Sequence, residues 1–267
     1  MISHSLSALL LGILEGLTEF LPISSTGHLL IAEHWLGRHS VFFNIVIQAG
    51  AILATCVVFR RRLVDFFYRW NQPEQFDYLL KLSGAFAVTV VIGLPLRLAG
   101  WQLPESLTPI AYALIIGGIW ILVCESYMKR VADQTDVSWK VAIGVGLAQV
   151  IAGACPGTSR SGAAIFLAML LGLTKRSAAT EFVFLVGIPT MFAASGYAFL
   201  ETLRHHAQIQ EPVVDIGIGF FAALLTGFIV VQWLFNYIKT RSYSGFAYYR
   251  IGLGALILIL SQSSPFK

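Results

Sequence analysis

Six stretches of this chain are apolar enough and long enough to cross a lipid bilayer as helices. A spanning helix needs about 20 mostly apolar residues. The six stretches lie at about 41 to 59, 82 to 100, 107 to 128, 179 to 200, 213 to 238 and 247 to 264. The one from 179 to 200 contains Pro189 but keeps the necessary length. The sequence therefore predicts an all-α polytopic membrane protein.

The composition supports a membrane location for the whole chain. Of its 267 residues 57% are hydrophobic and only 12% are charged, and the mean hydropathy is +0.75. A soluble domain of this size could not bury so much apolar surface. No long linker or low-complexity tract interrupts the chain, so we expect a single integral membrane domain over residues 1–267.

Two further apolar regions are each interrupted in the middle. Residues 5–36 are cut by "PISSTG" and residues 140–173 by "PGTSRSG". Clusters of Pro, Gly and Ser break helices, and each remaining half is too short to span. Both regions are therefore predicted to form re-entrant helical hairpins. Irregular backbone at membrane depth is tolerated only where it is buried in protein or lines a watery cavity, so we expect the breaks to line a site.

The two interrupted regions also resemble each other. "EGLTEFLPISSTGH" begins at Glu15, and "QVIAGACPGTSRSG" begins 134 residues later at Gln149. Both place a proline at the eighth position, followed by hydroxyls and glycine. This indicates a duplication, with repeat 1 at about 1–137 and repeat 2 at about 138–267. Each repeat would contain a hairpin and three transmembrane helices. An odd number of crossings inverts the second copy, and paired broken helices of inverted repeats meet near the midplane.

The basic residues give the orientation. With the N-terminus outside, thirteen fall on the inner side: Arg60, Arg61, Arg62, Arg69, Lys81, Lys129, Arg130, Lys140, Lys175, Arg176, Lys239, Arg241 and Arg250. Four fall on the outer side: Arg38, Arg97, Arg204 and Lys267. This bias follows the positive-inside rule. The net charge of +4 is then a topology signal and requires no nucleic-acid partner.

The first break carries two carboxylates, Glu15 and Glu19, four residues apart on one helix face. A charged side chain near the bilayer centre costs about 2.5 to 3.5 kcal/mol on insertion scales. A cation is therefore expected beside them, either a basic partner or a divalent metal. Carboxylate oxygens suit Mg²⁺ or Ca²⁺. The alternative is that one glutamate is protonated or caps a helix.

Hydroxyls and a histidine follow these carboxylates, at Ser24, Ser25, Thr26 and His28. Histidine titrates near neutral pH, so a histidine close to carboxylates can act as general acid, general base or nucleophile. We favour such a role for His28. The alternative is a hydrogen-bonded packing residue.

The second break has the opposite charge. Its glycines free backbone amides, its hydroxyls donate hydrogen bonds, and its single guanidinium can bind phosphate in a bidentate way. The residues concerned are Gly157, Thr158, Ser159, Arg160, Ser161 and Gly162. Alternatively, Arg160 neutralises Glu15 or Glu19, and both roles can coexist. Together the two breaks predict a metal-assisted phosphoryl site.

"EGLTEFLPISSTGH" and "PGTSRSG" resemble the two signature motifs of the undecaprenyl-diphosphate phosphatase (bacitracin-resistance) family of bacterial inner-membrane enzymes. The resemblance extends over most of the chain, including "IQAGAI" from Ile47 and "KRSAATEF" from Lys175. In one departure, Ala163 and Ala164 stand where family members often carry threonine. The resemblance implies hydrolysis of undecaprenyl diphosphate to undecaprenyl phosphate and inorganic phosphate. It also implies dependence on a divalent metal and a site open to the periplasm.

Carried over by motif position, the family's roles fall on both breaks. Glu15 and Glu19 would handle metal and water, and Ser25 and His28 would belong to the catalytic centre. Arg160 and the flanking hydroxyls would bind the diphosphate. The attacking group could be water, Ser25 or His28, and the sequence does not choose among them.

A lipid-phosphate flippase or anion transporter is the alternative from another class, because transporters also build sites from inverted repeats with broken helices. Type 2 phosphatidic acid phosphatases are disfavoured, because no histidine follows Ser159 and Arg160 at short range. The expected partners are the polyprenyl diphosphate substrate and membrane lipids, with a homodimer as a further possibility.

Overall fold

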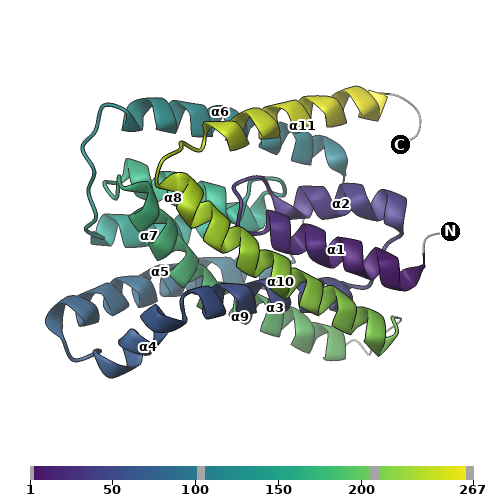
Figure 1. Cartoon of the computed structure of the whole chain (residues 1–267), viewed down its shortest axis with the longest axis horizontal. Helices are drawn as coiled ribbons and strands as arrows, with labels where there is room; N and C mark the ends of the chain where they lie inside the picture. The colour runs from purple at the N-terminus through teal and green to yellow at the C-terminus, as the bar shows by residue number, and fades with distance from the viewer. Residues whose placement is uncertain (1–2, 101–105, 205–210, 263–267) are drawn as a thin grey trace.

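The computed structural model describes residues 3–100, 106–204 and 211–262, which form eleven helices and no strand (Figure 1). Six of these helices are long and apolar enough to cross a membrane. They are α3 (Val41–Val58), α5 (Pro73–Leu98), α6 (Leu107–Met128), α9 (Arg176–Arg204), α10 (Val213–Ile238) and α11 (Ser244–Gln262). The all-α, polytopic class predicted from the sequence is thereby confirmed.

The ends of these helices differ from the predicted spans in places. Helix α5 begins at Pro73 rather than near 82, because proline suits a first helical turn and Asp77 pairs with Lys81 one turn later. Pro189 lies inside α9 without ending it. Residues 263–264 of the last predicted span, and Lys267, lie outside the described residues.

Both interrupted regions are broken where the sequence predicts. The first forms α1 (His4–Thr18) and α2 (Ser25–Leu36), and the second forms α7 (Trp139–Ala154) and α8 (Arg160–Leu170). Each of these helices has between 11 and 16 residues. All four are shorter than the roughly 20 residues that a spanning helix needs.

The helices pack in matching combinations. Helix α10 packs against α1 and α3, and α5 packs correspondingly against α7 and α9. Helices α6 and α11 pack on each other and run along one side of the molecule in Figure 1. The largest group of buried apolar side chains is centred on α7, α8 and α9 and includes Phe166 and Phe182.

A short helix of nine residues lies between α3 and α5. Helix α4 (Arg60–Tyr68) contains three consecutive arginines and has no buried residue. Its Phe67 and Tyr68 are largely exposed. Basic residues with exposed aromatics are typical of a helix at a membrane surface.

Arg250 corrects one part of the topology argument. The sequence analysis counts it among the basic residues of the inner side, although it falls near the start of the predicted span 247 to 264. In the structure α11 begins at Ser244, so Arg250 lies in its second turn, and its side chain is almost fully buried. It therefore contributes nothing to the surface charge bias.

Candidate active site

Each helix break ends at a serine with an unusual backbone. Ser24 has φ 73° and ψ 95°, and Ser159 has φ 66° and ψ 109°. They are the only non-glycine residues with positive φ in the described part of the chain. Each hydroxyl accepts a hydrogen bond from a glycine amide three residues on, Gly27 N at 3.4 Å and Gly162 N at 3.2 Å. Backbone strain of this kind concentrates at functional sites.

The matching serines correct the alignment of the two breaks. Pro22 and Pro156 are 134 residues apart, but Ser24 and Ser159 are 135 apart. The second break therefore holds one additional residue after its proline, and the 134-residue shift applies only up to that point. Downstream of it, Ser25 corresponds to Arg160, because each is the first residue of its helix.

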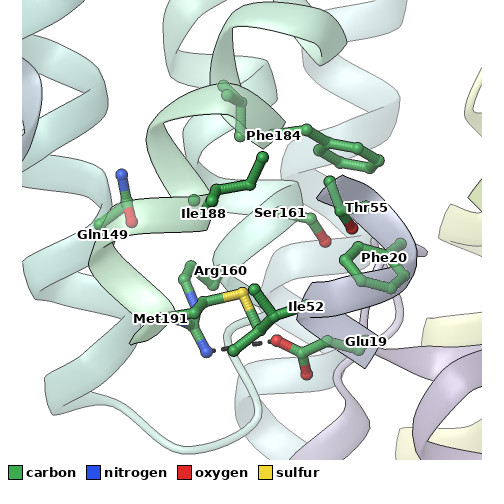
Figure 2. A pocket seen from close by; sticks show the side chains of 12 residues that line it. Glu19, Phe20, Ile52, Thr55, Gln149, Arg160, Ser161, Phe184, Ile188 and Met191 are labelled. Carbon is green, nitrogen blue, oxygen red and sulfur yellow. Dashed lines mark hydrogen bonds and ion pairs between the residues drawn. The ribbon is translucent and has the colours of Figure 1, made fainter. Parts of the chain in front are cut away.

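Glu19 joins the two breaks. Its Oε1 accepts a hydrogen bond from Arg160 Nη2 at 3.2 Å, and its Oε2 accepts one from Ser25 Oγ at 2.5 Å. The Glu19 side chain is 6% exposed and that of Arg160 is 29% exposed. Figure 2 shows this ion pair at one side of a pocket. The predicted neutralisation of a glutamate by Arg160 is therefore present in the structure.

Glu15 lies one turn before Glu19 and is 2% exposed. Its Oε2 has no hydrogen-bond partner among the described residues. A buried carboxylate oxygen without a partner, beside a second carboxylate, fits one edge of the shell of a hard divalent cation. The described residues contain no group of three or more His, Cys, Asp or Glu side chains placed to hold a metal, so further ligands would have to come from phosphate and water.

His28 contacts a residue that the sequence did not indicate. Its Nδ1 lies 2.7 Å from the Ser24 carbonyl oxygen and its Nε2 lies 2.7 Å from the Tyr249 hydroxyl. A carbonyl only accepts, so Nδ1 donates to it, and the neutral ring then accepts from Tyr249 at Nε2. The two rings stack with centroids 5.6 Å apart. Both nitrogens of His28 are thus used, and its hydrogen bonds do not go to the carboxylates.

A hydrogen bond joins the second break to the first. Ser161 Oγ donates to the Leu21 carbonyl at 3.1 Å and lies 3.2 Å from Ser159 Oγ. Gly157 has φ +86°, and a Cβ there would lie 2.8 Å from the Ile110 carbonyl oxygen, so a larger residue would collide with α6. Thr158 is partly buried, whereas Thr26 is exposed on α2.

A pocket extends from the ion pair between α3, α7, α8 and α9. Its polar side chains are Glu19, Arg160, Ser161, Thr55 and Gln149. Its apolar walls are formed by Phe20, Ile52, Val183, Phe184, Ile188 and Met191 (Figure 2). Of the predicted site residues, Glu19, Arg160 and Ser161 line this pocket. Glu15, Ser25 and His28 are not among its lining residues, but Ser25 Oγ donates to Glu19, which does line it.

Arg250 is a site residue that the sequence analysis missed. It is 1% exposed and donates to five backbone carbonyls. These are Pro22 at 3.0 Å, Thr158 at 3.2 Å, Gly157 at 3.1 Å, Ala113 at 3.0 Å and Leu114 at 3.3 Å. It thus binds both breaks to each other and to α6. The available signal was an arginine within an apolar segment, which commonly marks function.

Both helix breaks and most of the helices around them lie in a part of the chain that matches a known protein family. The family model described as "Bacitracin resistance protein BacA" matches residues 8–256. The chain belongs to the BacA family. Both signature breaks, the ion pair between them and Arg250 fall within the matched BacA region, so the resemblance noted in the sequence is confirmed.

Two relatives show how far the similarity to BacA proteins extends. A protein of Xanthomonas campestris pv. campestris (strain 8004), named undecaprenyl-diphosphatase, is 61% identical over 257 residues, which cover 96% of this chain and 98% of the relative. A protein of the same name from Xylella fastidiosa (strain 9a5c) is 60% identical over 252 residues, covering 94% of this chain and 97% of the relative.

Proposed function

We propose that this chain hydrolyses undecaprenyl diphosphate to undecaprenyl phosphate and inorganic phosphate, which recycles the lipid carrier of bacterial cell-wall synthesis. The observation that carries the proposal is the contact between Arg160 and Glu19, which brings the two breaks together in a pocket with apolar walls. A guanidinium suits the phosphates and the apolar walls suit a prenyl chain. The names of the similar relatives agree with this activity.

The placement in the membrane is part of the same proposal. Helices α1 and α2, and α7 and α8, would form re-entrant hairpins in two inverted repeats of a bacterial inner-membrane protein. The exchanged packing of α10 and α5 and the matching serine caps support the repeat. The basic side of the chain would face the cytoplasm, so the site would open toward the periplasm.

Ser25 is the nucleophile that the geometry favours. Its hydroxyl is held by the Glu19 carboxylate at 2.5 Å, and a nucleophile beside a base is the usual arrangement for covalent catalysis. Ser25 Oγ would attack the terminal phosphorus while its proton passes to Glu19. The bond between this phosphorus and the bridging oxygen breaks, and undecaprenyl phosphate leaves. Water then cleaves the phosphoserine, which releases inorganic phosphate and restores the hydroxyl.

Arg160 would bind the phosphate oxygens during this reaction, with the amides at the start of α2 and α8 directed at the same anion. His28 would donate or accept a proton through Nε2 when Tyr249 rotates away. Glu15 and Glu19 would hold Mg²⁺ or Ca²⁺. Such an ion, when bound, neutralises negative charge on the phosphates and on the leaving oxygen.

Phosphate release by the detergent-purified protein tests the proposal. Undecaprenyl diphosphate is supplied with and without a chelator, to the wild type and to Glu19→Gln and Arg160→Ala. The exposed ion pair of Arg97 with Glu201, 3.0 Å long against 3.2 Å for Arg160 with Glu19, offers the matched controls Arg97→Ala and Glu201→Gln. We expect loss of turnover in the two site variants and with chelator, and normal turnover in the controls.

A wild-type protein that binds the lipid but releases no phosphate with any divalent ion would contradict the hydrolase. Lipid flipping in liposomes would then be measured, since a flippase is the alternative. If only the chelator has no effect, and the wild type still releases phosphate in its presence, the proposed dependence on a divalent metal is contradicted and the hydrolase is not.

A further inference from the structure

Two polar side chains in the pocket wall have no hydrogen-bond partner within the described part of the molecule. Gln149 on α7 is 4% exposed, and neither its Oε1 nor its Nε2 is paired. Thr55 on α3 is 2% exposed, and its Oγ1 is likewise unpaired. Buried polar groups are nearly always hydrogen-bonded, because leaving them unpaired costs free energy. Two such groups in one pocket indicate that a ligand with polar atoms binds there.

Both residues line the same pocket as the ion pair. Figure 2 shows Gln149 and Thr55 on opposite sides of the pocket, with Arg160 and Ser161 between them. Among the described residues that line this pocket, Arg160 is the only cation. A diphosphate offers more acceptor oxygens than one guanidinium can satisfy, and the Ser161 hydroxyl already donates to the Leu21 carbonyl. Additional donors are therefore needed from the walls.

We propose that Gln149 and Thr55 are substrate-binding residues that complete the diphosphate site. The Gln149 amide supplies two N–H donors and the Thr55 hydroxyl supplies one, directed at phosphate oxygens. The first isoprene units then lie against Ile52, Ile188 and Met191. This inference rests on the proposed function and extends it to residues outside both breaks.

The pairing of Gln149 with Glu15 supports this assignment. The two residues occupy corresponding positions, 134 residues apart and upstream of the prolines. The first repeat has a carboxylate there and the second has a neutral amide of nearly the same shape. A second carboxylate on the Arg160 side would repel a diphosphate, whereas an amide can donate to it.

Two other residues of the same types, the partly buried Gln48 and the buried Thr190, do not share this state. Gln48, also on α3, accepts a hydrogen bond from Ser195 Oγ at 3.1 Å, and it does not line the pocket. Thr190 donates to the Val186 carbonyl of its own helix at 2.7 Å. These residues use their polar atoms within the protein, so they serve as matched controls for Gln149 and Thr55.

Steady-state kinetics and thermal melting of the purified protein test the inference. Gln149→Met and Thr55→Val keep the side-chain volume and remove the donors. We expect KM for undecaprenyl diphosphate to rise about tenfold for each, with kcat changed only a few-fold. The melting temperature should stay equal or rise, because no internal hydrogen bond is lost. Gln149→Glu should raise KM further.

The controls should show the reverse pattern. Gln48→Met and Thr190→Val should lower the melting temperature and leave KM unchanged. If Gln149→Met and Thr55→Val behave like these controls, the inference is overturned and the two residues are structural.

Binding of inorganic diphosphate, measured by calorimetry, separates this inference from the proposed function. If the wild type does not hydrolyse the lipid, the function fails, and weaker diphosphate binding by Gln149→Met than by the wild type still supports the inference. Equal binding by both proteins overturns it, whatever the activity.

Discussion

Ser24 in the first helix break and Ser159 in the second have nearly the same backbone conformation and the same glycine-amide cap, yet the residues around them differ in charge. After Ser24 comes Ser25, bonded to Glu19, and after Ser159 comes Arg160, bonded to the same glutamate. The two breaks therefore share a backbone that presents a helix N-terminus, and they differ in the charge of the side chains beside it. The first break carries the carboxylates and, in the proposed mechanism, the nucleophile, and the second break carries the cation.

The breaks also differ in what holds them. The Ser24 carbonyl is bonded to His28, which is in turn bonded to Tyr249 of α11. The position after Gly162 that corresponds to His28 is Ala163, which has no polar atom in its side chain. Arg250 contacts carbonyls of both breaks and so fixes one against the other. The proposed chemistry therefore depends on a residue that belongs to neither break.

The largest effect is expected for Arg250→Met, which separates the two breaks. Five buried carbonyls lose their donor, so we expect the free energy of unfolding to fall by about 3 to 5 kcal/mol, with loss of turnover. Thermal melting in detergent measures this change. Arg241→Met, at an exposed position, is the control and should have almost no effect. A stable Arg250→Met protein would show that the breaks associate without it.

Arg160→Lys tests whether the second break needs only a charge. Lysine keeps the charge but loses the planar fork that binds phosphate at two points, so we expect kcat/KM to fall about 100-fold. The melting temperature should change little, because Arg160 is partly exposed. Phosphate release is the measurement. Turnover near the wild-type rate would mean that Arg160 is only the counter-ion of Glu19.

Replacing the cap serines tests the similarity of the breaks. Alanine at either position loses the cap and keeps the backbone strain that serine already carries at positive φ, so Ser24→Ala and Ser159→Ala should each lower the free energy of unfolding by about 1 to 2 kcal/mol. Glycine tolerates this backbone, so the glycine variants should lose only a few tenths of a kcal/mol. Unequal results from melting curves at the two positions would show that the breaks are not equivalent.

Tyr249→Phe should have the smallest effect, and one that concerns the first break alone. It removes the hydroxyl that lies 2.7 Å from His28 Nε2 and keeps the stacked ring. One hydrogen bond contributes about 0.5 to 1.5 kcal/mol, so we expect a change in kcat of a few-fold to about tenfold. His28→Ala should then be insensitive to the added Tyr249→Phe change. Additive effects in this double-mutant cycle would contradict a functional His28–Tyr249 pair.

The sequence by itself determined the number of long apolar helices, the positions of both breaks and the residue types within them. These features depend on local properties: the length of an apolar run, the breaking effect of Pro and Gly, and the cost of a charge in lipid. The pair of Glu19 with Arg160 was also within reach, because two opposite buried charges in one small membrane domain tend to meet.

Only the tertiary structure decided which distant groups meet in space. The sequence placed Arg250 among the basic residues of the inner side, but packing of α11 on α6 brings it to both breaks. Packing of α3, α7, α8 and α9 likewise brings Thr55 and Gln149 to the pocket of Arg160. The serine dihedral angles showed which residues of the two breaks correspond, and so where the one-residue difference lies. Such contacts join residues far apart in the chain, so they follow from how the helices pack and not from any local pattern.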